Sequence, residues 1–213
     1  MYFFLLTLTA LFAYVLGSLS STVIASNFIF HANLKKLGTG NYAISEFRRI
    51  YGVKGIIKLA LVEVIKSLLA VLIGGWLLGI KDQALVGRAF AGFCLIMGRQ
   101  WPVFSELRGS RATVCLVIMA MCLDFGTGLA VLLVTCALIW FTRYITLSTL
   151  AGAVVLLFAA VLVMDSRLVT LLCLFTFIVM LAHSLPCISR MINGKEEKLD
   201  FTEDLNYKFD QKF

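Results

Sequence analysis

The sequence predicts an all-α, polytopic membrane protein with about seven transmembrane helices, an outside N-terminus and a cytoplasmic C-terminus. Of the 213 residues, 61% are apolar and 15% are charged, whereas soluble domains average about 45–50% apolar and about 25% charged residues. The long apolar runs lack the alternation of barrel strands. Because backbone polar groups must be satisfied within each span in lipid, the spans are expected to be helices.

The predicted spans fill a transmembrane domain, residues 1–189, and a charged cytoplasmic tail, residues 190–213, follows it. The first apolar stretch lacks the basic start of a signal peptide and is interpreted as a retained span. In chain order, the spans are expected at about 2–25, 55–80, 89–104, 112–123, 127–142, 147–163 and 168–189.

The apolar stretch 113–142 decides the topology, because it could cross the membrane once or twice. Asp124 lies near its middle and is followed closely by two glycines, which predicts a turn. Two crossings place all basic-rich segments on one face, as the positive-inside rule requires, whereas one tilted helix would move Arg143 to the other face. These segments are residues 31–54, loop 105–112, Arg143 and the tail.

Charge and cysteine patterns exclude several classes of function. The net charge is +7, but the basic residues stand at helix ends, where they orient the protein, so no nucleic acid partner is expected. The six cysteines are scattered without CxxC or Cys/His spacing, which predicts packing rather than a metal site or a disulfide framework. No catalytic triad or HEXXH motif occurs, so no cofactor is expected and an enzyme would work without a protein nucleophile.

Two basic turns that contain glycine are candidates for phosphate binding. Backbone N–H groups of such turns can converge on an oxyanion, and arginine binds phosphate in a bidentate manner. The alternative is that both are tight turns with ordinary interfacial arginines. The first turn consists of Gly38, Thr39, Gly40 and Asn41, with Arg49 downstream. The second consists of Arg108, Gly109, Ser110 and Arg111.

Polar residues inside the predicted spans leave two interpretations open. Glu63 and Lys66 are three residues apart and therefore share a helix face. They could form a structural pair or shape a polar site, because charges within a span need a partner or a wet cavity. Ser18 could serve close helix packing or face a substrate. His183 is interpreted as a structural histidine near an interface.

Seven segments agree in order and spacing with the motifs of one known family. They are Gly17-Ser18, Gly38 to Asn41 with Arg49, Glu63 to Lys66, Gly98 to Phe104, Arg108 to Arg111, Thr142 to Ser148 and Arg190 to Glu196. In these segments the chain resembles the integral-membrane acyl-phosphate:glycerol-3-phosphate acyltransferases of bacterial phospholipid synthesis. The resemblance implies a multi-pass protein of the bacterial inner membrane with a cytoplasmic active site.

The resemblance also implies the reaction and the residues that carry it. A fatty acyl group would pass from acyl phosphate to the 1-hydroxyl of glycerol 3-phosphate, giving lysophosphatidate, and membrane lipids would be the other partners. Catalytic roles would fall to Arg111, Asn41, Thr146 and Ser184. Substrate binding would fall to Ser18, Gly38, Thr39, Gly40, Arg49, Arg108, Gly109, Ser110 and Arg143.

Several positions depart from the family pattern. Arg99 stands for a histidine, Glu46 for an asparagine and Arg111 for a lysine. The family's later histidine falls on Ser184, so that His183 is one residue out of register. A divergent enzyme and a catalytically degenerate paralogue that binds a lipid precursor or a membrane partner both remain open. A small transporter is less favoured, because no internal repeat is visible.

Overall fold

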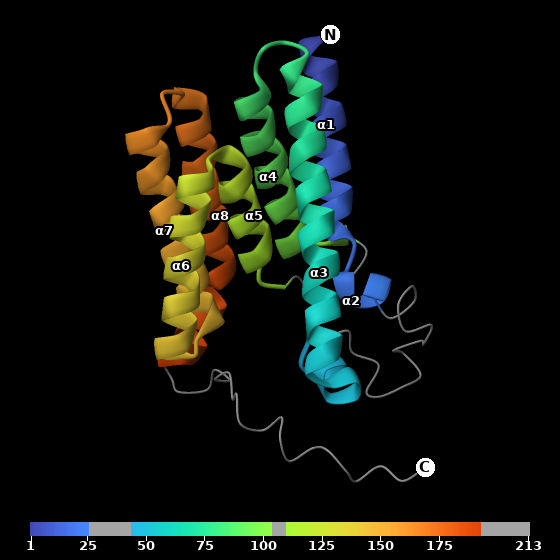
Figure 1. Ribbon diagram of the computed structural model, residues 1–213, viewed down its shortest axis with the longest axis vertical. Helices are drawn as coiled ribbons and strands as arrows, with labels where there is room; N and C mark the ends of the chain where they lie inside the picture. Colours follow the sequence, from blue (N-terminus) through green and yellow to red (C-terminus); the bar gives the residue numbers. More distant parts are fainter. Residues whose placement is uncertain (26–43, 104–109, 193–213) are drawn as a thin grey trace.

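The described part of the chain is entirely helical (Figure 1). The computed structural model describes the backbone of residues 1–25, 44–103 and 110–192, and the side chains of residues 1–25, 55–103, 110–189 and 191. Within these residues the helices are α1 (Tyr2–Ser18), α2 (Ser21–Ile24), α3 (Ile44–Gly79), α4 (Ala84–Gln100), α5 (Thr113–Leu123), α6 (Phe125–Thr142), α7 (Ile145–Val163) and α8 (Arg167–Ile192). The prediction of an all-α fold is confirmed.

The bundle has the surface of a protein that lies in lipid. Helices α6, α7 and α8 contain apolar stretches long enough to cross a membrane, and α1 and α5 are shorter apolar helices. Large apolar side chains cover the perimeter, and Phe3, Trp140 and Leu162 are each at least 74% exposed. Exposed apolar surface of this extent is unfavourable in water and favourable against hydrocarbon.

The long stretch 113–142 divides into two helices, as predicted. Helix α5 ends at Leu123, Asp124 has extended backbone angles, and α6 begins at Phe125 and runs back antiparallel to α5 (Figure 1). The Asp124 side chain accepts a hydrogen bond of 2.7 Å from the backbone N–H of Thr127. This is an N-cap, which satisfies a backbone donor that the first turn of a helix leaves unpaired.

The first apolar stretch differs from its prediction, because it is not one helix over 2–25. Helix α1 ends at Ser18 and the short helix α2 begins at Ser21. The carbonyl of Leu19, which lies in the break, accepts a hydrogen bond of 2.9 Å from Lys66 Nζ on α3. A buried side chain thus satisfies a carbonyl that a continuous helix would have used.

The following two helices also begin earlier than predicted. Helix α3 starts at Ile44 instead of near 55 and is 36 residues long. Helix α4 covers Ala84–Gln100 instead of about 89–104. The predicted span 55–80 therefore lies within α3, whose first turns belong to the polar, basic segment that precedes the span.

Glycines bring α1 and α4 into close contact. A Cβ atom at Gly17 would overlap the carbonyl oxygen of Leu95, and one at Gly98 would overlap the carbonyl oxygen of Tyr14. Small residues at such crossings allow helix backbones in membranes to approach each other closely. This contact holds the C-terminal end of α4 against α1. The chain segment that leads to the candidate site begins directly after α4.

Candidate functional site

Glu63 is the centre of a buried network that joins four helices. Its Oε2 atom lies 3.4 Å from Lys66 Nζ and 3.2 Å from Arg99 Nη2. The hydroxyl of Ser21 donates to the same oxygen, and Cys115 Sγ donates to Oε1 over 3.2 Å. The side chain of Glu63 is 7% exposed. A carboxylate buried to this degree needs several partners of this kind, because its hydration is lost.

All three donors of the Lys66 ammonium group have partners in this network. Its Nζ atom donates to the carbonyl of Leu19 and, over 3.1 Å, to the hydroxyl of Ser21, besides pairing with Glu63. A lysine ammonium has three donors, and these partners account for all three. Of the two interpretations open for Glu63 and Lys66, the contacts therefore favour the structural pair, with Arg99 as a third member that the sequence did not indicate.

Arg111 and Thr146 form a second polar cluster. Arg111 lies just before α5 and is exposed, whereas Thr146 is buried in the first turn of α7. Arg111 Nε donates a hydrogen bond of 3.0 Å to Thr146 Oγ1. The bond fixes the orientation of the guanidinium plane. Two residues that the sequence analysis placed in one catalytic group are thus in direct contact, although they are 35 residues apart.

A histidine on α8 lies close to this cluster. The His183 ring stands edge-on to the Trp101 ring, with centroids 5.6 Å apart, and Arg111 lies within electrostatic range of His183. Ser184, the next residue, is buried. The sequence predicts a structural role for His183 and shows Trp101 only as part of a motif. The signal that could have found His183 was its offset of one residue from the family's histidine position.

The segment after α4 is fastened to the helices around it. Tyr14 donates its hydroxyl proton to the carbonyl of Trp101 over 2.8 Å, and the backbone N–H of Val103 donates to Ser18 Oγ over 2.9 Å. The backbone N–H of Ser110 donates to the carbonyl of Arg99 over 3.3 Å. Ser18 therefore anchors this segment, and the contact gives a structural reason for its position at the end of α1.

The remaining predicted site residues are described in part. Arg143 ends α6 in the left-handed conformation, with φ of 58°, and its side chain is exposed. Arg49 lies in the first turns of α3, but its side chain is outside the described residues. Six other predicted positions also lie outside them, namely Gly38, Thr39, Gly40, Asn41, Arg108 and Gly109.

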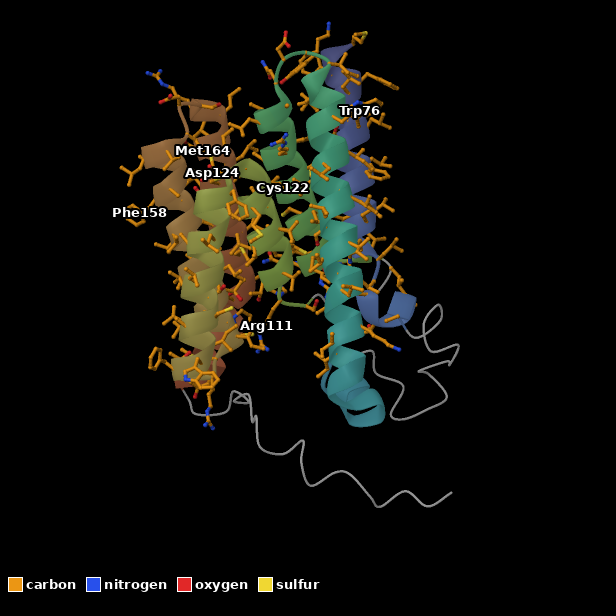
Figure 2. All side chains as sticks on the ribbon, viewed as in Figure 1. Trp76, Arg111, Cys122, Asp124, Phe158 and Met164 are labelled. Atoms are coloured by element: carbon orange, nitrogen blue, oxygen red, sulfur yellow. The ribbon has the colours of Figure 1, made fainter. Side chains whose placement is uncertain are left out.

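The candidate site lies toward one end of the bundle. The start of α3, the junction of α6 and α7, and the end of α8 are at the lower end in Figure 1, and Arg111 lies on this side in Figure 2. A shallow pocket of about 500 Å³ lies near Trp76 and Arg88, toward the opposite end. Neither Arg111 nor Thr146 lines this pocket, so it is separate from the candidate site.

Together, the apolar perimeter and the polar cluster at one end define an integral membrane protein with a candidate anion-binding site. Within this class, the family model described as glycerol-3-phosphate acyltransferase matches residues 7–194, and the chain belongs to this family.

Curated relatives agree with the family assignment. A glycerol-3-phosphate acyltransferase of Thermoanaerobacter sp. (strain X514) is 27% identical over 192 residues, which cover 90% of this chain and 94% of the relative. A protein of the same name from Shouchella clausii is 29% identical over 195 residues, with the same coverage of both chains.

Solved structures support the fold. Two crystal structures of PlsY (YgiH), an integral membrane glycerol 3-phosphate acyltransferase, superpose with a TM-score of 0.74 over 94% of this chain and 98% of theirs. Their sequences are 18% identical to this one. One structure is the glycerol 3-phosphate form and the other the lysophosphatidic acid form. At this identity the likeness establishes the fold of an integral membrane protein.

Proposed function

We propose that this protein transfers a fatty acyl group from acyl phosphate to the 1-hydroxyl of glycerol 3-phosphate, giving lysophosphatidate. Its membership of the family supports the reaction. The observation that carries the proposal for the site is the hydrogen bond between Arg111 and Thr146. It holds a permanently charged guanidinium at the N-terminal end of α5, where the helix dipole also favours an anion.

Both substrates carry a phosphate, which a site of this kind can bind. Guanidinium groups bind phosphate through paired, charge-assisted hydrogen bonds, which add geometric specificity to the attraction. Arg111 would hold a phosphate group, and Thr146 would keep the guanidinium in place. His183 of α8 lies within electrostatic range of Arg111, Ser184 is the next residue and is buried, and we assign both to contacts with the substrates.

The chemistry needs little from the protein beyond orientation and charge. The 1-hydroxyl oxygen of glycerol 3-phosphate forms a bond to the acyl carbon, and the bond from this carbon to the phosphate oxygen breaks. Inorganic phosphate leaves, and it can accept the proton that the hydroxyl group loses. Acyl phosphate is already activated, so positioning and stabilisation of the developing negative charge can supply the catalysis.

The other predicted residues complete this proposal. Gly38, Thr39, Gly40 and Asn41, with Arg49, would form the second phosphate-binding turn. Arg108, Gly109, Ser110 and Arg143 would add contacts around Arg111. The first turns of α3, which contain Arg49, point toward the same end of the bundle as Arg111, which supports a shared site (Figures 1 and 2).

We further propose that the chain crosses the bacterial inner membrane seven times, with the N-terminus outside and the tail 190–213 in the cytoplasm. The antiparallel pair α5 and α6 supports this topology, because it returns Arg143 to the end where Arg111 lies. Helix α5 has 11 residues, or about 16 Å at 1.5 Å per residue, and is therefore a partial span of the roughly 30 Å core.

One assay tests the proposed function. Purified protein in detergent is supplied with acyl phosphate and glycerol 3-phosphate, and lysophosphatidate and inorganic phosphate are measured. We expect equal amounts of both products. The variant Arg111→Ala should lose activity by about 100-fold or more, as expected when one stabilising group is removed from a charged transition state. It should remain folded, because Arg111 is exposed.

The matched control is Arg167→Ala, which removes an exposed arginine at the start of α8, at the opposite end of the bundle. This variant should keep normal turnover. Normal turnover in Arg111→Ala would refute the assignment of the site. A wild-type protein that binds both substrates without forming product would refute the proposed reaction and favour the catalytically degenerate paralogue, which none of the comparisons reported above supports.

A further inference from the structure

A buried ion pair connects the interior of the bundle to the loop that carries Arg111. Arg99 Nη2 lies 3.2 Å from Glu63 Oε2, and the Arg99 side chain is only 11% exposed. The backbone carbonyl of the same residue accepts the hydrogen bond from the N–H of Ser110, which directly precedes Arg111. Arg99 therefore pairs with the buried carboxylate of Glu63 through its side chain, and it accepts a hydrogen bond from Ser110 through its backbone carbonyl.

The charge on Arg99 makes its position depend on Glu63. A guanidinium stays protonated under any burial. Moving it away from Glu63 would leave the guanidinium charge without its ionic partner in a region of low polarity, which is strongly unfavourable. Glu63 is itself held by Lys66, Ser21 and Cys115. The network thus anchors the C-terminal turn of α4 to α3.

The segment after Arg99 connects the end of α4 to the candidate site. Trp101 and Val103 are held by hydrogen bonds to α1, and the Trp101 ring packs on His183 of α8. These bonds involve uncharged groups. Among the described residues, the ion pair between Arg99 and Glu63 is the charged contact that holds this segment in place.

We propose that Arg99 is a positioning residue, whose ion pair with Glu63 sets where Ser110 and Arg111 stand and thereby sets the affinity for glycerol 3-phosphate. The inference rests on the proposed function and adds to it a requirement that lies outside the substrate contacts. Arg99 acts through Arg111, and it touches neither substrate nor the reacting atoms.

The primary variant is Arg99→Gln, which removes this ion pair and leaves Glu63 paired with Lys66. The remaining charges of Glu63 and Lys66 balance, so the carboxylate is not left unpaired. We expect folded protein in which KM for glycerol 3-phosphate rises about tenfold, a typical size for coupling through a packed network, while kcat falls less. The backbone N–H of Ser110 should also exchange with deuterium faster than in the wild type.

The matched control is Ser67→Ala. Ser67 belongs to the same buried region, since its hydroxyl donates to Cys115 Sγ over 3.4 Å, but it makes no described contact with the loop. This variant should leave KM and the exchange of Ser110 unchanged. An equal rise in KM in both variants would mean that general loosening of the network is responsible, and it would overturn the proposal.

A double-mutant cycle separates positioning from a merely structural role. If Arg99 acts through Arg111, the loss of glycerol 3-phosphate binding in Arg99→Gln combined with Arg111→Lys should be smaller than the sum of the single losses. Additive losses would overturn the proposal. So would a folded Arg99→Gln protein with wild-type KM and wild-type exchange at Ser110.

A conservative variant decides the matter if Arg99→Gln does not fold. Arg99→Lys keeps the charge but has a shorter reach and no planar fork, so KM should rise about threefold. An unchanged KM in this variant would again overturn the proposal. A wild-type protein without acyl transfer would refute the proposed function, but the exchange measurement at Ser110 would still test the link from Glu63 to the loop.

Discussion

The variant Thr146→Val tests how the orientation of Arg111 contributes to activity. Valine has nearly the shape of threonine but cannot accept the hydrogen bond that Arg111 Nε donates over 3.0 Å. Hydrogen bonds to charged groups contribute roughly 1.5–3 kcal/mol. Because Arg111 is exposed, water replaces part of this, and we expect a loss of about 1.4 kcal/mol, or about tenfold in kcat/KM.

Thr149→Val is the matched control for this prediction. Thr149 lies one turn further along α7, is also buried, and shares a hydrogen bond of 2.6 Å with Thr113 of α5. It therefore links α7 to the first residue of α5, two residues after Arg111, without a hydrogen bond to Arg111. The assay is the rate of lysophosphatidate formation at varied glycerol 3-phosphate. Equal losses in both variants, or wild-type kinetics in Thr146→Val, would refute the role of this hydrogen bond.

Two further predictions concern stability. Gly98→Ala should sharply reduce the yield of folded protein, measured by gel filtration in detergent, because its methyl group would overlap the Tyr14 carbonyl; a normal yield would contradict this packing. Backbone hydrogen bonding from Thr127 holds the pKa of Asp124 below its usual value. The stability from this cap is thus present above the unfolded pKa and is lost as pH falls through the folded pKa. In Asp124→Asn this part of the acid dependence of Tm should disappear, and an unchanged pH profile would contradict the assignment.

Local signals in the sequence were sufficient for one break in the helices and insufficient for another. The turn between α5 and α6 follows from Asp124, which caps the next helix with its own side chain and is read from adjacent residues. The break between α1 and α2 depends on Lys66, which is 47 residues away from Leu19 in the chain. Such a break becomes visible only when the two helices are packed together.

The same distinction applies to the candidate site. The spacing of Glu63 and Lys66 indicated a pair on one helix face, and the structure contains it. Arg99 was visible only as a departure from a family motif, because its carboxylate partner lies on another helix. Contacts within a helix can be read from periodicity, whereas contacts between helices need the three-dimensional arrangement.

Three buried polar atoms near the site favour a ligand-binding protein. Arg99 Nε, Gln100 Oε1 and Ser110 Oγ have no hydrogen-bond partner among the described groups. Each such atom costs about 1–3 kcal/mol when it stays unpaired, and natural proteins contain few of them. Two of them, Arg99 Nε and Gln100 Oε1, belong to the last turn of α4, whereas the third belongs to Ser110, which directly precedes Arg111. We therefore expect a bound phosphorylated substrate to pair with the hydroxyl of Ser110.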